Sequence, residues 1–320
     1  MRTRSLLAAL ATGTPVSGAT LAAQLGISRA AVWKQIEQLR ARGLPVAARA
    51  GQGYALPYPL ELLDADTIRA AASPKTIIEV HDSLDSTSSE LLRRANQAAD
   101  LTFAFAEVQS AGRGRRGRVW LAPPALNLTF SVLKRFEHGF AALSGLSLAV
   151  GVAVAETLAA TGVPRLALKW PNDLQADGRK LGGILIELGG EFLGPCHAVI
   201  GIGINLRLTP ALVAAAGQPV TDLAALCGGT PPARNDLAAR LTVALAQALE
   251  QFAGHGFAPF VARYATLDAL RDRALTISGN GGTFSAVGAG VDARGALRVR
   301  RDDDGGVECL DSAEITVRAA

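Results

Sequence analysis

The stretch GRGRRGRVWLAPPALNLTF, residues 112–130, decides whether the chain can have a dinucleotide-binding fold. Its three glycines spell G-x-G-x-x-G, the fingerprint of dinucleotide-binding domains. In those domains the glycine turn opens a helix, and the N-terminus of that helix binds the pyrophosphate. Here Pro123 and Pro124 follow, which exclude a helix, and the next element has the pattern of a strand. The stretch therefore does not predict a nicotinamide site, and the chain contains no G-x-x-x-x-G-K-[ST] motif either.

The same loop is well suited to binding an anion. Its glycines are Gly112, Gly114 and Gly117, and its arginines are Arg113, Arg115, Arg116 and Arg118. Glycine lets backbone N–H groups approach an anion closely, and a guanidinium group pairs with carboxylate or phosphate through parallel hydrogen bonds. We interpret the stretch as a mobile lid over a charged ligand, in which the glycines supply the mobility.

Strand-like and helix-like segments alternate between about residues 62 and 265. The apolar runs TFAFAEVQ, NLTFSVL, LGGILIEL and HAVIGIGINL predict buried strands. A capping box at Thr87-Ser88-Ser89-Glu90 predicts the start of a helix. The apolar run from Phe140 to Ala155 is shorter than a membrane span and predicts one buried helix over about 140–161. We therefore predict an α/β or α+β domain around a central sheet.

Two lysines stand close together in a chain that has few. Only five of its 32 Lys and Arg residues are lysines. Lys169 begins KWPND, residues 169–173, at a strand end, and Lys180 precedes two glycines after a predicted hairpin at 176–178. A lysine before two glycines lies where a backbone and a phosphate can come close. Either feature alone fits an ordinary strand end, but together they indicate an anion-handling site.

The first 60 residues differ from the rest in charge and pattern. They hold seven basic residues and one acidic residue, a net +6 in a chain whose total is +4. Three helical patterns, with a tight turn at 26–28 before the third, and a hairpin around 51–53 predict a winged helix-turn-helix. The residues expected to contact DNA are Ser28, Arg29, Lys34, Arg49 and Gln52. A winged helix that binds protein is the alternative, and Pro57 and Pro59 mark a linker after the module.

Composition is typical of a globular cytoplasmic protein. Hydrophobic residues make up 49% of the 320 residues and charged residues 19%, which supports a large core and argues against global disorder. Cys196, Cys227 and Cys309 form no C-x-x-C pair, so they predict neither a zinc site nor a disulfide framework and fit a reducing compartment. We expect no targeting segment and no membrane span.

Taken together, the motifs resemble those of the bifunctional biotin–protein ligases that double as biotin operon repressors. The matching pieces are GQGYALP, DSTSSE, QSAGRGRRGRVW, KWPNDL, GRKLGGILIE and GIGIN, in the family's order and over about residues 5–205. The resemblance implies a multidomain α+β chain. Its parts would be a winged helix-turn-helix over 1–60, a class II synthetase-like catalytic domain with a mixed sheet over 61–268, and a small SH3-like β-barrel over 269–320.

The resemblance also implies an activity and its partners. In the family, the biotin carboxylate attacks the α-phosphate of ATP in the presence of Mg²⁺, which gives biotinyl-5′-AMP and pyrophosphate. A lysine of the biotin carboxyl carrier protein of acetyl-CoA carboxylase then takes the biotin and releases AMP. The adenylate is also the co-repressor, which promotes a homodimer that binds operator DNA.

Roles follow from the resemblance residue by residue. The catalytic positions are Lys180, Arg115 and Asp173, and Asp173 is also the candidate Mg²⁺ ligand. The biotin-binding positions are Ser86, Thr87, Gln109, Gly112, Arg113, Gly114, Arg115, Lys180 and Gly183. The positions for ATP and the adenylate are Arg115, Arg116, Arg118, Trp120, Asn172, Lys180 and Asn205. Ser88 stands where the family usually has asparagine, and it either replaces the hydrogen bonds of that amide or weakens biotin binding slightly.

Two rival interpretations remain at this point. A lipoate or octanoate ligase shares the central fold, although the arginine loop and KWPND argue against it. A transcription factor whose central domain only senses a ligand would share the winged helix without any catalysis.

Overall fold

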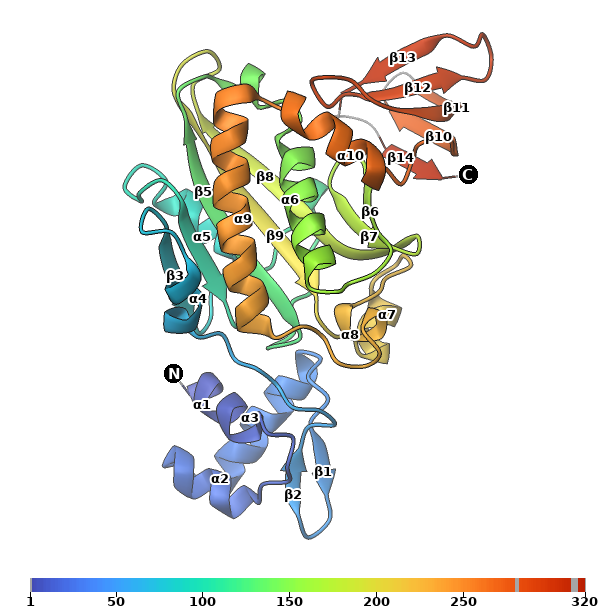
Figure 1. Ribbon diagram of the computed structural model, residues 1–320. Coiled ribbons are helices and arrows are strands. Elements are labelled where there is room, and N and C mark those ends of the chain that lie inside the picture. Colours follow the sequence, from blue (N-terminus) through green and yellow to red (C-terminus); the bar gives the residue numbers. More distant parts are fainter. Residues whose placement is uncertain (1, 280–281, 312–315, 320) are drawn as a thin grey trace.

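The computed structural model describes residues 2–279, 282–311 and 316–319. Three regions follow one another in space (Figure 1). A helical region with a two-stranded hairpin lies at one end, a seven-stranded sheet with its helices lies in the middle, and a five-stranded sheet lies beyond them. This arrangement confirms the predicted class, a multidomain α+β chain with a winged helix, a mixed central sheet and a β-rich C-terminal region.

The N-terminal region is a winged helix. Its elements are α1 (Arg2–Leu10), α2 (Gly18–Leu25), α3 (Arg29–Ala41), β1 (Ala47–Arg49) and β2 (Gly53–Ala55). Gly26, at a φ of 61°, ends α2 in the left-handed conformation that glycine adopts without strain. The Ser28 hydroxyl then accepts a hydrogen bond from the Ala31 N–H and begins α3. The predicted helix-turn-helix is therefore present, and the glycine and serine of its turn end α2 and begin α3 as expected.

The core of the winged helix continues into the central region. Leu126, which follows the arginine loop, and Leu212 of α7 (Pro210–Ala215) are buried in the same apolar cluster as Leu6 and Leu10 of α1. The guanidinium of Arg207, which follows β9 (Cys196–Asn205), lies 4.1 Å from the centroid of the ring of Tyr58 in the connecting segment. The predicted linker at Pro57 and Pro59 is thus a packed connector, because the aromatic residue between the two prolines has a partner.

The central sheet is mixed and has the strand order β3-β4-β5-β9-β8-β7-β6. Only the β3–β4 pair is parallel among its neighbouring strands. The strands are β3 (Ile77–His81), β4 (Thr102–Ala106), β5 (Asn127–Phe136), β6 (Leu166–Lys169), β7 (Asp173–Ala176), β8 (Arg179–Gly190) and β9 (Cys196–Asn205). Long apolar runs in β4, β5 and β9 are buried, because helices or loops cover both faces of the sheet there.

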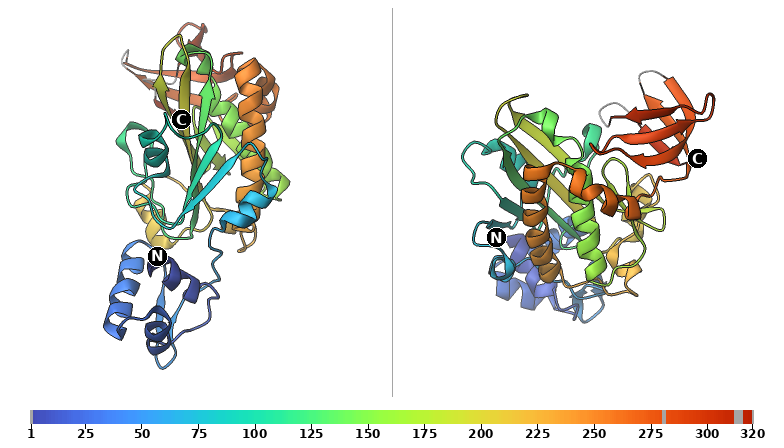
Figure 2. Two further views of the ribbon diagram at one scale, coloured as in Figure 1. Left: turned by 90° about the vertical axis from the view of Figure 1, so that its left-hand side faces the viewer. Right: turned by 45° about the horizontal axis from the view of Figure 1, so that its top comes forward.

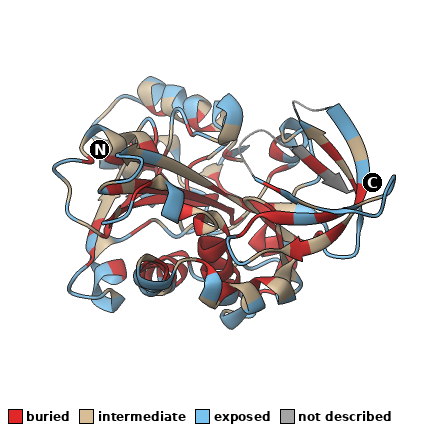
Figure 3. Ribbon diagram, turned by 90° about the horizontal axis from the view of Figure 1, so that it is seen from above, coloured by how far each residue is buried: buried red, intermediate tan, exposed pale blue. Residues whose placement is uncertain are grey.

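Helices α6 (Leu146–Ala160) and α9 (Arg234–His255) cover one face of this sheet, and α5 (Thr87–Arg93) lies on the other (Figures 1 and 2). Buried residues gather where the long helices meet the strands (Figure 3). The single helix predicted over 140–161 is instead a 3₁₀ turn, Phe140–Leu143, followed by α6. Gly145 separates the two at a φ of 80°, where a Cβ atom would come within 2.7 Å of the Phe257 side chain.

The apolar character of that segment belongs to the core. Residues 140–160 are long and apolar enough to cross a membrane, but 67% of the most apolar window is buried inside the fold. Eleven of the 15 residues of α6 are buried. Burial on all sides explains why its apolar residues do not follow a helical stripe. The expectation of a buried helix in this region is therefore confirmed for α6.

The C-terminal region is an antiparallel sheet with the order β13-β12-β11-β10-β14. Its strands are β10 (Ala274–Gly279), β11 (Gly282–Val291), β12 (Leu297–Arg301), β13 (Val307–Leu310) and β14 (Thr316–Ala319). Buried residues such as Leu275 and Val299 belong to the same apolar cluster as the central sheet. The short helices of the molecule include α4 (Ala65–Ala71), α8 (Leu223–Leu226) and α10 (Val261–Leu267). The SH3-like closure of the sheet and the three domain boundaries stay predictions.

Candidate active site

A cavity of about 1020 Å³ opens on the face of the central sheet that carries α5. Its walls come from distant parts of the sequence: the start of α5, the arginine loop, KWPND, β8, β9 and the segment 215–220. Of the residues predicted for biotin or nucleotide, those that line it are Ser86, Thr87, Gln109, Arg113, Gly114, Arg115, Arg116, Arg118, Trp120, Asn172, Asp173, Lys180, Gly183 and Asn205. Gly112, which precedes Arg113 in the sequence, is not among the lining residues. The fold therefore brings nearly the whole predicted set together.

The start of α5 forms one wall. The N-cap is Ser86 rather than Thr87, and its hydroxyl accepts from the Ser89 N–H at 3.5 Å. Ser86 has an extended backbone, as an N-cap requires, so the predicted capping box was placed one residue too late. The Thr87 N–H donates to Gln109 Oε1 at 2.8 Å. This bond orients the Gln109 amide and leaves its Nε2, with two N–H donors, as the end available to a ligand.

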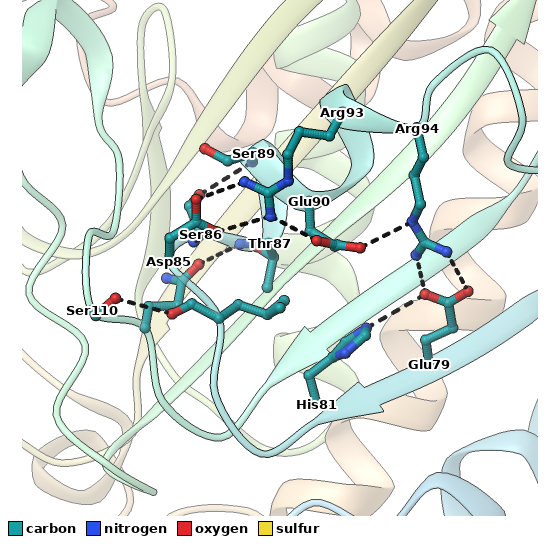
Figure 4. Close-up of polar contacts among 12 residues, drawn as sticks. Glu79, His81, Asp85, Ser86, Thr87, Ser89, Glu90, Arg93, Arg94 and Ser110 are labelled. Carbon is teal, nitrogen blue, oxygen red and sulfur yellow. Dashed lines mark hydrogen bonds and ion pairs between the residues drawn. The ribbon is translucent and has the colours of Figure 1, made fainter.

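Charged side chains hold this first turn from outside the cavity (Figure 4). Arg93 donates to both carboxylate oxygens of Asp85, at 2.7 and 3.1 Å, and Asp85 in turn accepts from the Ser86 N–H at 2.8 Å. The hydrogen bonds from Arg93 and Ser86 lower the pKa of Asp85 to about 2, so its carboxylate stays ionised at neutral pH. The ion pairs continue from Arg93 to Glu90 and Arg94 on the helix and from Arg94 to Glu79 on β3. His81 Nε2 lies 3.5 Å from the Glu79 carboxylate.

The arginine loop closes on itself. The Gly114 N–H donates to the Arg118 carbonyl at 2.8 Å, and the Trp120 N–H donates to the Gly112 carbonyl at 2.9 Å. A Cβ atom at Gly112 would overlap the Trp120 carbonyl, and Gly117 has a φ of 71°. These two glycines are therefore needed for close packing and for a left-handed turn, which corrects the prediction that they only supply mobility.

Positive charge gathers at the mouth of the cavity. Arg115, Arg116 and Arg118 all line it, and Arg115 donates to Asn172 Oδ1 at 3.0 Å. Burial holds the pKa of Arg115 below its usual range, and the charges of Arg116 and Arg118 act in the same direction. An anion between these side chains would relieve their mutual repulsion. Arg113 instead pairs with Glu187 at 2.6 Å, so its guanidinium points away from that cluster.

A β-bulge places the two catalytic candidates on one face. Asp173 pairs with Gly183 and Leu174 with Gly182, but Gln175 pairs with Lys180, so the buried Leu181 is the extra residue. Without that extra residue, Lys180 would point to the opposite face of the sheet. Instead, Lys180 Nζ lies 2.7 Å from Asp173 Oδ1, and the lysine side chain is only 17% exposed.

Glycines in β8 and β9 leave room beside these groups. A Cβ atom at Gly183 would lie 3.5 Å from Lys180 Nζ, and one at Gly203 would overlap the Trp120 indole ring. The ring of Trp120 therefore lies flush against β9. Its Nε1 is buried and has no hydrogen-bond partner among the described residues. Asn205 lies nearby in the lining and donates from Nδ2 to the Thr221 carbonyl at 3.1 Å.

Sequence reasoning missed three features of the site. Trp170 of KWPND is buried, and its Nε1 donates to the Gly295 carbonyl of the C-terminal region at 3.1 Å. The segment 215–220 lines the cavity and pairs with the Lys180 backbone, although its sequence shows no motif. Ser131 is fully buried beside Thr87, and its only signal was a lone serine in the apolar run NLTFSVL.

The winged helix presents the residues predicted to contact DNA. Ser28, Arg29, Lys34, Arg49 and Gln52 are all exposed, although the Ser28 hydroxyl is already engaged as the N-cap of α3. Sequence reasoning also missed Trp33, whose side chain is 58% exposed on the same helix. Arg29 and Lys34 on the same helix are cationic. The negative charge of Glu37 is paired with Arg40 at 2.6 Å. This surface is suited to a polyanion.

Known proteins resemble this chain over most of its length. Over 316 residues, 99% of this chain and 97% of the relative, the chain is 38% identical to the bifunctional ligase/repressor BirA of Salmonella typhimurium. The chain belongs to the BirA family of bifunctional ligase/repressors. Residues 80–205 match the biotin/lipoate A/B protein ligase family, and residues 2–55 match an HTH domain.

Two further relatives of this BirA-family chain lack part of its length. The biotin–[acetyl-CoA-carboxylase] ligase of Paracoccus denitrificans is 33% identical over 72% of this chain and 96% of its own. A biotin protein ligase from Aquifex aeolicus, solved in complex with biotin and ATP, superposes with a TM-score of 0.65 and 24% identity. That structure covers 76% of this chain and 99% of its own, and the likeness establishes the shared fold.

Proposed function

We propose that this chain activates biotin with ATP and transfers it to a lysine of the biotin carboxyl carrier protein of acetyl-CoA carboxylase. The observation that carries the proposal is one cavity with two different ends. Neutral hydroxyl and amide groups of Ser86, Thr87 and Gln109 line one end, while Lys180, Arg115, Arg116 and Arg118 stand at the other. Such a cavity suits a ligand that is polar but uncharged at one end and anionic at the other.

In the first step, a biotin carboxylate oxygen attacks the α-phosphorus of ATP, and pyrophosphate leaves with the electron pair of the broken P–O bond. Both reactants are anions, so their approach is opposed by charge repulsion. Lys180 and Arg115 would offset this repulsion and the charge that develops on the phosphoryl oxygens. Lys180 has little freedom to move, since its backbone is bonded on both sides to the segment 219–221.

In the second step, the amine of the carrier lysine attacks the carbonyl carbon of biotinyl-5′-AMP. AMP leaves with the electron pair of the broken C–O bond, and the amine loses its extra proton. Asp173 stands at the cavity wall, where its carboxylate could orient that amine. Arg116 and Arg118 would lie over the adenylate and keep water from the anhydride.

Asp173 is the one carboxylate predicted as a Mg²⁺ ligand. The described residues contain no group of three His, Cys, Asp or Glu side chains that could hold a metal. This fits an ion that arrives on the ATP phosphates, since Mg²⁺ in such sites commonly keeps only one or two carboxylate ligands. Mg²⁺ would supply charge neutralisation of the phosphates, and Asp173 is the residue that would contact it.

We also propose that the winged helix binds operator DNA as part of a homodimer and that the adenylate promotes this dimer. The basic exposed face of α3 and the wing support DNA as the partner. A two-fold dimer would set the spacing of two half-sites on the operator. Operator, carrier protein and ATP meet in the cytoplasm, which is where we place the protein.

The test is ATP–pyrophosphate exchange with biotin or with lipoate, followed by transfer of biotin to a carrier domain. We expect exchange with biotin and loss of exchange in Lys180→Ala. Exchange with lipoate alone would identify a lipoate ligase, and no exchange in the parent chain would leave a ligand-sensing transcription factor. Titration of operator DNA with and without biotin and ATP tests the proposed repressor role. DNA affinity that is the same with and without biotin would refute that role.

A further inference from the structure

We propose that Ser131 is a positioning residue that makes the neutral end of the cavity specific for a cyclic urea. The inference rests on the proposed function and names the ligand group that this end of the cavity binds. Ser131 does not line the cavity; it acts through Thr87 and Ser88, which do. Nothing in the motifs of the chain assigns a role to it.

Three hydroxyl groups meet beneath the start of α5. Ser131 Oγ lies 2.7 Å from Thr87 Oγ1 and 3.0 Å from Ser88 Oγ. All three residues are nearly or fully inaccessible to solvent, at 0% for Ser131, 3% for Thr87 and 4% for Ser88. Buried hydroxyls in a low-dielectric environment depend on such partners, and linked hydrogen bonds polarise one another.

The strand register leaves Ser131 little freedom. It pairs with Ala104 of β4 on one side and with Gly201 of β9 on the other. A Cβ atom at Gly201 would lie 2.6 Å from Ser88 Oγ and 3.5 Å from Ser131 Oγ. The hydroxyl cluster therefore occupies the space that the missing side chain of Gly201 leaves.

Counting protons shows what the cluster offers to a ligand. Three hydroxyls carry three protons, and the two contacts within the cluster use two of them. One donor and several lone pairs remain, and Thr87 is the member held at the cavity wall by its N–H bond to Gln109. If Ser131 accepts from Thr87, then Thr87 presents lone pairs to an N–H; if Ser131 donates, Thr87 presents its proton to a carbonyl.

A cyclic urea matches this arrangement because it has N–H donors and a carbonyl acceptor on adjacent atoms. A dithiolane or a plain acyl chain has neither and would leave the one remaining donor of the cluster without an acceptor. Sites built to hydrogen-bond a ligand reject analogues that lack the bonding group far more strongly than apolar pockets discriminate by size. Ser131 thus contributes to the choice of biotin over lipoate and octanoate.

The test compares Ser131→Ala with the parent chain for binding and kinetics, with biotin and with 2-iminobiotin, whose C=NH replaces the urea carbonyl. We expect the Kd and KM for biotin to rise about tenfold or more, with kcat at saturating biotin and KM for ATP unchanged. The ratio of the Kd of Ser131→Ala to the Kd of the parent should approach one for 2-iminobiotin. This ligand lacks the urea carbonyl, so the parent chain has no matched hydrogen bond to lose. Thr102→Val, which removes another buried hydroxyl away from the cavity, should match the parent.

Equal penalties for biotin and 2-iminobiotin, or an unchanged Kd for biotin, would overturn the role of Ser131. If Ser131→Ala fails to fold, Ser131→Cys fills the same space with a weaker hydrogen-bonding group and should still raise the KM for biotin but not for ATP. Absence of biotin-dependent exchange in the parent chain would refute the proposed function itself, and this inference with it.

Discussion

The indole Nε1 of Trp170 donates a hydrogen bond of 3.1 Å to the carbonyl of Gly295. The tryptophan belongs to KWPND at the wall of the cavity, and the glycine belongs to the turn before β12. Both residues are buried. A motif that looks catalytic in the sequence therefore also fastens the C-terminal sheet to the central domain.

Replacing this tryptophan tests the fastening. Trp170→Phe keeps an aromatic ring but leaves the buried Gly295 carbonyl without its donor, which should lower the free energy of unfolding by about 1–3 kcal/mol. Urea denaturation measures the change. Trp33→Phe is the matched control, since that side chain is exposed and should leave stability unchanged. Equal stability of Trp170→Phe and the parent would contradict the role of the bond.

Removing the cavity lysine separates chemistry from binding. Lys180→Ala should slow biotin-dependent pyrophosphate exchange by about 100-fold or more, because one preorganised positive charge is lost where negative charge develops. Biotin binding, measured by calorimetry, should fall much less, since Ser86, Thr87 and Gln109 remain. Lys75→Ala, on an exposed turn, is the control and should exchange at the parent rate. A parental exchange rate in Lys180→Ala would rule out its catalytic role.

The contact between Gly203 and the Trp120 ring predicts a selective defect. Gly203→Ala would push its new methyl group into the indole ring, so the ring must move away from β9. We expect a higher KM for ATP with a smaller change in KM for biotin. Gly254→Ala is the control, because a Cβ atom at this position in α9 meets nothing within 4 Å. It should leave both KM values unchanged, whereas a uniform rise in both for Gly203→Ala would argue against a nucleotide-side role.

The contact between α7 and the winged helix predicts a change at a distance from the active site. Leu212 is 9% exposed and packs in the winged-helix core, so Leu212→Ala should destabilise that region by about 2 kcal/mol or more. Limited proteolysis should then cut the connector at 57–62 faster than in the parent. Val213→Ala, beside it but 48% exposed, should be cut at the parental rate. Equal cleavage in all three proteins would show that the contact contributes no stability.

The exposed tryptophan of α3 predicts two separable effects on DNA binding. Trp33→Ala should reduce the preference for operator over random DNA by about tenfold, because an apolar side chain in the major groove reads base edges. Lys34→Ala should weaken binding to both DNAs alike and lower the salt dependence by about one ion. Titrations at several salt concentrations distinguish the two. Identical behaviour of Trp33→Ala and Lys34→Ala would show that Trp33 does not read sequence.

Local patterns were enough to predict the elements but not all of their limits. The alternation of apolar residues and the turn residues correctly predicted the winged helix, the strands β4, β5, β8 and β9, and the hairpin at 176–178. The break before α6 and the N-cap of α5 were misplaced by the same patterns. Both depend on a contact or backbone angle that neighbouring residues impose, such as the approach of Phe257 to Gly145.

The sequence by itself determined the family-like set of motifs, the elements that carry them and the clustering of cationic residues near them, because these depend on residue order and short-range periodicity. Only the tertiary structure decided which groups meet. The bulge at Leu181 turns Lys180 toward Asp173, and the register of β5 with β9 places Ser131 beneath Thr87. Docking of Leu212 joins the winged helix to the cavity wall. Each of these contacts joins segments whose pairing is set by the packing of the whole sheet, which no local pattern encodes.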